Sequence, residues 1–398
     1  METHTLAKPD LVRLWVIGGT NNVVRWLELL SAALFVYELT GSGLAVAAVS
    51  AARTLPMLLF GAFAGVVSET ANRKRIMMTG MVITATMSIS IGGLAFAGLA
   101  EPWQVGLASF VCGAVWSTDM PSRRRMVGDA AGPELLGRAI AVDSLAGATT
   151  RMIGPLLGAV VYNFVGLPGA YALTTLLSAS NFLLAWPIRH TQTTRRLSFG
   201  GALRDLLDGM RSAREMPQVM AVIGVTMAMN CFVFSYSAVV APIARGLFDA
   251  PTALVGFLAA AESAGALLAG LAMARRMPAL SPRQLMIGGS VTFALSLVLM
   301  PLVGNFWLAC LILLIGGTGT AAFSNMQTLL VMNGAPPSMR SRLLGLITVC
   351  IGTGPLGQLA IGALADAFGL RVAVEAMAIT GVITILAIGA LWRRVEAR

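Results

Sequence analysis

Twelve long apolar segments follow one another along the chain and constrain its fold more than any other feature. A helix that crosses a bilayer needs about 20 consecutive, mostly apolar residues. Charged residues make up only 12% of the chain, whereas a water-soluble domain carries about 25%. We therefore predict an all-α membrane protein with twelve transmembrane helices. The segments cover residues 14–38, 45–67, 76–99, 103–121, 139–163, 168–187, 218–243, 251–273, 284–303, 305–332, 343–365 and 371–391.

The two halves of the chain carry a shared sequence signature. Gly154-Pro155-Leu156 in the fifth segment recurs as Gly354-Pro355-Leu356 in the eleventh segment of the 398-residue chain. This repeat indicates two related copies, and thus two pseudo-symmetric six-helix bundles. Membrane proteins with two related halves are most often transporters.

One long polar stretch, residues 189–218, separates six segments from six and marks a domain boundary. We predict an N-terminal six-helix bundle at 1–188, a cytoplasmic linker at 189–217 and a C-terminal six-helix bundle at 218–398. Apolar residues at helical spacing also predict a short amphipathic helix within the linker. They are Leu203, Leu206, Leu207 and Met210.

The net charge of +10 is explained by where the basic residues lie. Nearly all of them fall at segment ends or loops that an alternating topology places on one face, and only Arg245 and Arg371 fall on the other. The positive-inside rule then places both termini and the linker in the cytoplasm. We expect a multi-pass protein of a bacterial cytoplasmic (inner) membrane. The aromatic pattern of a nucleic-acid groove is absent, so no nucleic-acid partner is expected.

The sequence offers little to build an enzyme or a metal site. Its two histidines, His4 and His190, lie outside the apolar segments, and its four cysteines lack metal-ligand spacing. It also lacks the Gly-rich Lys-Ser/Thr loop of an ATP-driven pump. We expect no enzymatic activity, no cofactor and no metal.

Four motifs, in this order, resemble the major facilitator superfamily and come closest to its branch of bacterial exporters that includes the enterobactin exporter. The resemblance covers nearly the whole chain. It implies two six-helix bundles around a central cavity that opens alternately to the two sides of the membrane. The motifs are Tyr37-Glu38-Leu39-Thr40-Gly41-Ser42, Arg53-Thr54-Leu55-Pro56, Gly154-Pro155-Leu156-Leu157-Gly158 and the run from Arg342-Leu343-Leu344-Gly345 to Ala365-Asp366.

The loop between the second and third segments departs from that family's usual pattern of Gly, Asp-Arg and a basic cluster. Glu69 keeps the acid, but Thr70 replaces the arginine that follows it. The resemblance still implies a cytoplasmic latch, and Asp119 could pair with Arg73 within it. A plain solvated loop is the alternative. The predicted latch residues are Gly65, Glu69, Arg73 and Asp119.

The fifth segment resembles a motif found in exporters of the superfamily. Gly147, Gly154 and Gly158 share one helical face with Arg151. Small residues let a neighbouring helix approach closely, and Pro155 can bend the segment. Tight packing explains the glycines, but it does not explain Arg151.

Five ionisable residues stand out near the bilayer centre, where a charge costs about 3 kcal/mol or more and is usually functional or paired. Arg25 and Glu28 are three residues apart and can pair on one helix surface. A self-neutralising structural pair and a role in the cavity are equally compatible with that spacing. The five residues are Arg25, Glu28, Arg53, Arg151 and Glu262.

Arg151 and Glu262 lie at matching depth in the fifth and eighth segments, which face each other across the two halves in the superfamily. We predict that they meet. If the pair separated during transport, the carboxylate in its apolar site would become easier to protonate, which would couple protons to transport. A permanent structural pair is the alternative. Glu28, Arg25 and Asp143 are further candidates for proton coupling or gating, although Arg138 or a loop arginine could neutralise Asp143.

Uncharged polar residues within the segments are the candidates for the substrate cavity, together with one tryptophan. They are Asn21, Asn22, Trp26, Asn181, Asn230, Tyr236, Asn325, Gln327 and Gln358. The 22 methionines would give an adaptable apolar lining if they faced the cavity, although packing and lipid contact account for most such residues. We expect an amphipathic or hydrophobic substrate.

These features predict a monomeric secondary active transporter with a small-molecule substrate, protons and the lipid bilayer as its partners. Its expected activity is proton-coupled efflux of amphipathic organic molecules, such as drug-like compounds or siderophores, by an antiporter that works through alternating access. An importer or facilitator of a specific metabolite is one alternative, and counterflow without a pH gradient would reveal it. A transport-inactive membrane sensor is another, although no sizeable soluble domain supports it.

Overall fold

The computed structural model describes residues 8–189, 208–276, 279–336 and 339–396, without the side chains of residues 62–70, 341 and 395–396. Every regular element in these residues is helical. The linker residues 190–207, which carry most of the predicted amphipathic helix, lie outside the described residues. The all-α fold agrees with the sequence prediction.

The N-terminal half contains the elements α1 (Pro9–Thr40), α2 (Gly43–Thr70), α3 (Arg73–Phe96), α4 (Pro102–Ala131) and α5 (Leu136–Ala185). The 50 residues of α5 are two helices joined at Gly166, whose φ of 66° and ψ of −163° interrupt the helical path. Glycine adopts a positive φ without steric cost. The predicted break between the fifth and sixth apolar segments therefore lies at this residue.

The C-terminal half contains more interruptions. Its elements are α7 (Pro217–Ala228), η1 (Met229–Val233), η2 (Phe234–Val239), α8 (Val240–Phe248), α9 (Thr252–Arg275), α10 (Pro282–Leu299), η3 (Met300–Leu302), α11 (Phe306–Gly334), α12 (Arg340–Ile351), α13 (Gly354–Phe368) and α14 (Leu370–Glu396). The path from α7 to α8 passes through a π-helical turn, η1, and a 3₁₀ turn, η2. Such turns often occur at functional sites.

Nine helical segments within the described residues are long and apolar enough to cross a membrane. One of them is the bent α5, whereas the long helices α1 and α4 are not among the nine. The chain is thus a multi-pass membrane protein, and the count of twelve crossings stays a prediction.

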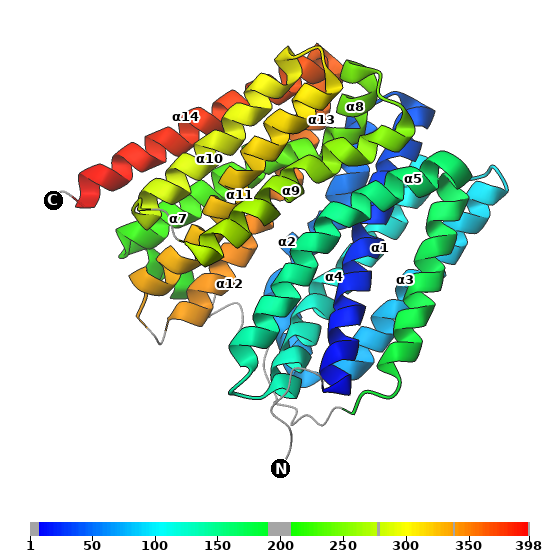
Figure 1. Ribbon diagram of the computed structural model, residues 1–398, viewed down its shortest axis with the longest axis horizontal. Coiled ribbons are helices and arrows are strands. Elements are labelled where there is room, and N and C mark those ends of the chain that lie inside the picture. The colour runs from blue at the N-terminus through cyan, green and yellow to red at the C-terminus, as the bar shows by residue number, and fades with distance from the viewer. Residues whose placement is uncertain (1–7, 190–207, 277–278, 337–338, 397–398) are drawn as a thin grey trace.

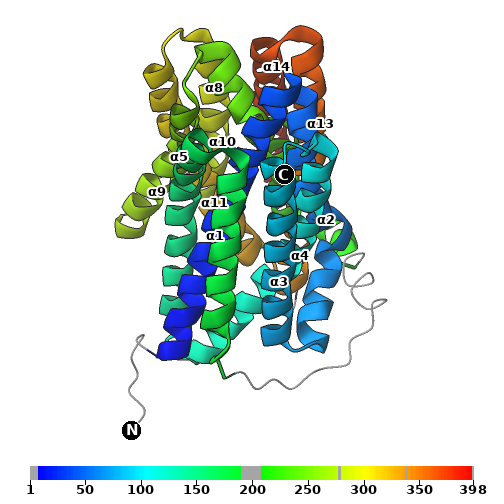
Figure 2. The ribbon, with the colours of Figure 1, turned by 90° about the vertical axis from the view of Figure 1, so that its right-hand side faces the viewer.

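The two halves lie side by side, the N-terminal one blue to green and the C-terminal one green to red (Figure 1). They meet through two pairs of helices, α5 with α9 and α2 with α13. At the upper end of both views, the end of α1 and the start of α2 also approach α8 and α13 (Figures 1 and 2). These contacts join the two halves.

Glycines set the distance between α5 and its neighbours. A Cβ atom on Gly154 would lie 2.6 Å from the Cβ of Trp26, and one on Gly158 would lie 3.1 Å from the Cα of Leu27. On the opposite side, a Cβ on Gly256 of α9 would lie 2.7 Å from the carbonyl oxygen of Pro155. Close approach of this kind is typical of small residues between membrane helices. The glycine motif thus holds α5 between α1 and α9.

Candidate substrate cavity between the two halves

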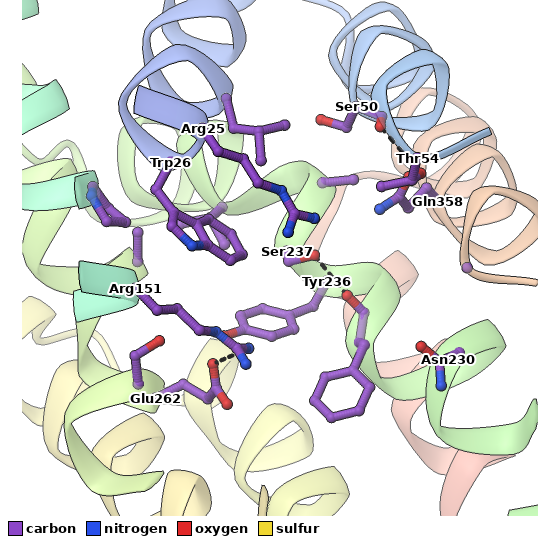
Figure 3. Close-up of a pocket in the computed structure, with 18 of the residues that line it drawn as sticks. Arg25, Trp26, Ser50, Thr54, Arg151, Asn230, Tyr236, Ser237, Glu262 and Gln358 are labelled. Atoms are coloured by element: carbon purple, nitrogen blue, oxygen red, sulfur yellow. Dashed lines mark hydrogen bonds and ion pairs between the residues drawn. The ribbon is translucent and has the colours of Figure 1, made fainter. Parts of the chain in front are cut away.

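A cavity of about 380 Å³ lies between the two halves, lined by side chains from both. Five of the nine predicted cavity residues line it: Trp26, Asn230, Tyr236, Gln327 and Gln358. Figure 3 shows Trp26 and Arg25 reaching in from the N-terminal half, with Tyr236 and Asn230 on the C-terminal side. The π and 3₁₀ turns place Asn230, Tyr236 and Ser237 in its wall.

The other four predicted residues lie outside the cavity lining. Asn181 donates to Asn21 over 2.8 Å, and Asn21 donates to Asp119 over 3.3 Å, so these amides are used within the N-terminal half. Asn22 lies against Gly147, at 3.7 Å from the position of a Cβ there. Asn325 contacts the sulfur of Met273 at 3.9 Å. Some polar side chains of these helices therefore contact neighbouring helices, whereas others face the cavity.

Several residues with hydroxyl or aromatic side chains line the cavity but were not predicted from the sequence. They are Ser50, Thr54, Phe234, Ser237, Ser263, Phe323 and Ser324. Serine and threonine are common on any membrane helix because their hydroxyls can bond to the carbonyls of the preceding turn. Thr54 alone belonged to a family motif, which was the one available signal.

The predicted contact between Arg151 and Glu262 is present. Arg151 Nη2 donates to Glu262 Oε2 over 3.0 Å and thereby joins α5 to α9 in the cavity wall (Figure 3). The Glu262 side chain is 4% exposed and that of Arg151 is 39% exposed. The second carboxylate oxygen of Glu262 has no hydrogen-bond partner in the described residues. The carboxylate therefore depends on Arg151 for its compensation.

Arg25 and Glu28 do not pair with each other, which corrects one of the two interpretations of their spacing. Arg53 Nη1 donates to Glu28 Oε2 over 2.7 Å, and Ser88 donates to the other oxygen over 3.0 Å. These bonds tie α1 to α2 and α3 inside the N-terminal half. Arg25 instead lines the cavity, with its guanidinium 4.6 Å from the ring centre of Trp116 and 5.2 Å from that of Trp26.

The interface between α2 and α13 is neutral where it meets the cavity. Thr54 Oγ1 donates to Gln358 Oε1 over 3.0 Å, and both side chains line the cavity. Further along, Asp366 of α13 accepts hydrogen bonds from the backbone N–H groups of Gly43, at 2.6 Å, and Leu44, at 3.2 Å, and from the hydroxyl of Ser42. A carboxylate at the N-terminus of a helix caps its unpaired N–H groups and interacts favourably with its dipole. Asp366, which had no predicted role, thus fastens the two halves at one end.

Asp143 is neutralised within the N-terminal half. Arg123 donates to both of its carboxylate oxygens, the second at 3.3 Å, and the Arg124 Nε lies 3.6 Å away. Of the partners expected from the sequence, Arg123 and Arg124, which follow the fourth apolar segment, are the ones present, and Arg138 is exposed. Asp143 therefore lies in a buried pair that joins α4 to α5.

The latch region differs from the expectation. Arg73 pairs with Asp129 at 2.8 Å, whereas Asp119 accepts from Asn21. The predicted pair between Arg73 and Asp119 is therefore wrong, because the carboxylate one turn beyond the basic cluster of α4 is the nearer partner. Gly65 and Glu69 belong to residues 62–70, whose side chains are not described.

Two helical halves around a polar and aromatic cavity define a membrane transporter. Residues 5–396 match the family described as transmembrane secretion effectors. The chain belongs to this family of the major facilitator superfamily. The match does not single out the branch with the enterobactin exporter, which stays a prediction.

Solved structures show the same fold. A bacterial homologue of the human lysosomal transporter Spinster, inward-facing and unoccupied, is 17% identical over 96% of each chain, with a TM-score of 0.71. A POT family transporter in complex with 5-aminolevulinic acid is 12% identical over 97% of this chain and 96% of its own, with a TM-score of 0.77. A nucleoside transporter is 15% identical over 96% and 99%, with a TM-score of 0.70. No curated protein matches the chain in sequence.

Proposed function

We propose that this protein is a secondary active transporter that exports small amphipathic organic molecules by alternating access, in exchange for protons. The observation that carries the proposal is the ion pair between Arg151 and Glu262, which joins the two halves within the cavity wall. The family description, transmembrane secretion, supports outward transport.

The geometry of this pair suits a proton-coupled step. Opening the contact between α5 and α9 would separate Arg151 from Glu262 and leave a carboxylate in a site where it is 4% exposed. Leaving one partner of a buried pair uncompensated costs about 3–5 kcal/mol. Proton uptake by Glu262 removes that cost, so protonation and separation of the halves favour each other.

The distribution of charge supports an orientation in the membrane. The end that Asp366 fastens lies opposite the end where α1 and α12 begin (Figure 1). Most of the arginines in the sequence fall at the latter end. The positive-inside rule puts the arginine-rich end in the cytoplasm of a bacterial inner membrane. The contact of Asp366 with α2 then closes the outer end, as an inward-facing state requires.

The test combines a screen with reconstitution. A deletion strain challenged with toxic compounds identifies an exported compound, which is then measured in proteoliposomes under an imposed pH gradient. We expect Glu262→Gln to abolish acceleration by the gradient and to retain exchange of the compound across the membrane. Glu375→Gln, which changes a carboxylate paired with Arg371 on α14, is the matched control and should behave as wild type.

Unaltered gradient-driven transport by the Glu262→Gln variant would remove Glu262 from the coupling step. If transport by the wild-type protein does not depend on the pH gradient, proton coupling is excluded altogether.

A further inference from the structure

Arg25 differs from the other arginines of the cavity region because no carboxylate compensates it. Arg53 pairs with Glu28 and Arg151 pairs with Glu262. In the described part of the chain Arg25 has neither an ion pair nor a hydrogen bond, and its charge meets the faces of two tryptophans. Figure 3 shows its guanidinium pointing into the cavity.

The charges that line the cavity do not cancel. Among the described lining residues, the charged ones are Arg25, Arg151 and Glu262, so two positive groups face one negative group. The positive charge is also the more accessible one, because the side chain of Arg151 is 39% exposed and that of Glu262 is 4% exposed. A molecule that enters this cavity therefore meets a positive field, which low-dielectric walls strengthen.

An uncompensated charge within a membrane helix is costly and is usually functional. A guanidinium group binds carboxylates and similar oxyanions through two parallel hydrogen bonds. In the same cavity, the rings of Trp26, Phe234 and Tyr236 offer apolar surface for the rest of such a molecule. A cationic compound would instead meet two like charges.

We propose that Arg25 is the subsite for an anionic group of the substrate, and that the protein transports amphipathic organic anions, with a carboxylate or related oxyanion attached to an aromatic or alkyl body. This inference rests on the proposed transport function and names its substrate class. It assigns Arg25 to substrate binding and leaves proton coupling to Arg151 and Glu262.

Three probes of one shape and different charge test the assignment: 2-naphthoate, 2-naphthamide and 2-naphthylmethylammonium. Their binding to the full chain in phosphatidylcholine nanodiscs is measured by titration calorimetry without a pH gradient. The wild-type protein should bind 2-naphthoate at least about tenfold more tightly than 2-naphthamide, because hydrogen bonds to charged groups are stronger than neutral ones. The ammonium probe should bind most weakly.

Arg25→Gln should bring the ratio between the anion and the amide to about one while the affinity for 2-naphthamide, which reports a folded cavity, stays the same. Arg25→Lys should retain part of the preference for the anion, since it keeps the charge. The control variant is Arg371→Gln, an exposed arginine on α14, and it should bind all three probes as wild type does.

A wild-type protein that binds 2-naphthoate no more tightly than 2-naphthamide would overturn the proposal, as would an anion preference that survives in Arg25→Gln. Loss of all three probes in both Arg25 variants would assign Arg25 to packing and would also overturn it. These readouts are independent of Glu262, so a failure of proton coupling and a failure of the anion subsite are distinguishable.

A last arm identifies the source of the anion. Phosphatidylglycerol added to the nanodiscs either displaces 2-naphthoate, which identifies a lipid headgroup as an occupant of the subsite, or leaves its binding unchanged, which identifies free organic anions. Either result supports the anion subsite.

Discussion

The two copies of Gly-Pro-Leu have the same sequence and different structures. The first copy, at Gly154, lies inside the helical α5, whereas the second begins α13 after a break that follows Ile351. The residues before the motif explain the difference. Met152-Ile153 continues the first helix, but Gly352-Thr353 interrupts the second, where glycine is a poor helix former and the hydroxyl of Thr353 donates to the carbonyl of Cys350.

Their surroundings differ as well. The first glycine is packed against Trp26, whereas a Cβ atom on Gly354 would meet nothing within 4 Å. Three residues earlier, the first copy has Arg151 and the second has Ile351. The duplicated scaffold has thus become a packed and charged contact in one half and a neutral break in the other.

The largest expected effect comes from removing the charge that only the first copy carries. Arg151→Ala should destabilise the protein by about 3 kcal/mol, the lower end for breaking a buried pair, because Arg151 is 39% exposed. Thermal unfolding in detergent measures it. The double variant Arg151→Ala/Glu262→Gln should recover most of the loss, since no buried carboxylate remains.

Thr54→Val at the opposite interface is the matched comparison and should cost about 1 kcal/mol, the value of one neutral hydrogen bond. Equal losses at the two interfaces would show that the charge at α5 and α9 makes no difference.

The packing difference between the copies can be tested with one substitution made twice. Gly154→Ala should cost about 1–3 kcal/mol, because its Cβ would press on the Cβ of Trp26 and force α1 and α5 apart. Gly354→Ala should cost nothing or stabilise slightly, by up to about 1 kcal/mol, since the site is open and helical. Thermal unfolding of both variants is the measurement, and similar melting temperatures would contradict the comparison.

The smallest expected effect concerns the fastening at Asp366. Asp366→Ala should cost about 1 kcal/mol, as loss of a helix cap typically does. Hydrogen exchange at the amides of Gly43 and Leu44 should then become up to about tenfold faster. Asp366→Asn retains an acceptor oxygen and should be intermediate. Unchanged exchange in Asp366→Ala would mean that the cap does not hold the outer end.

The all-α membrane fold could be predicted from the sequence because the lengths of the apolar segments and the Gly-Pro motifs within them are local signals. The pair between Arg151 and Glu262 could also be predicted. That prediction needed only the depth of each charged residue in the membrane and the helix arrangement of the family. The pairing of Glu28 could not be predicted from the sequence. Its partner Arg53 comes from another helix, and a spacing of three residues on α1 says nothing about neighbouring helices.

The cavity lining was predicted in part for a related reason. An asparagine on a membrane helix can face the cavity, as Asn230 does, or bond to a neighbouring helix, as Asn181 does with Asn21. Both choices satisfy its amide, so sequence alone does not separate them. The hydroxyls of serine and threonine give still less signal.

The uncompensated charge of Arg25 has a consequence for how the membrane potential would drive this protein. With a monoanion bound, the charges of the cavity cancel, and the loaded protein changes state without moving net charge. After release, proton uptake by Glu262 leaves two positive charges in the cavity, those of Arg25 and Arg151, and the potential acts on each with about 2.3 kcal/mol per 100 mV for a full crossing. In a cell that is negative inside, voltage would therefore act mainly on the empty protein and return it to the inward-facing state.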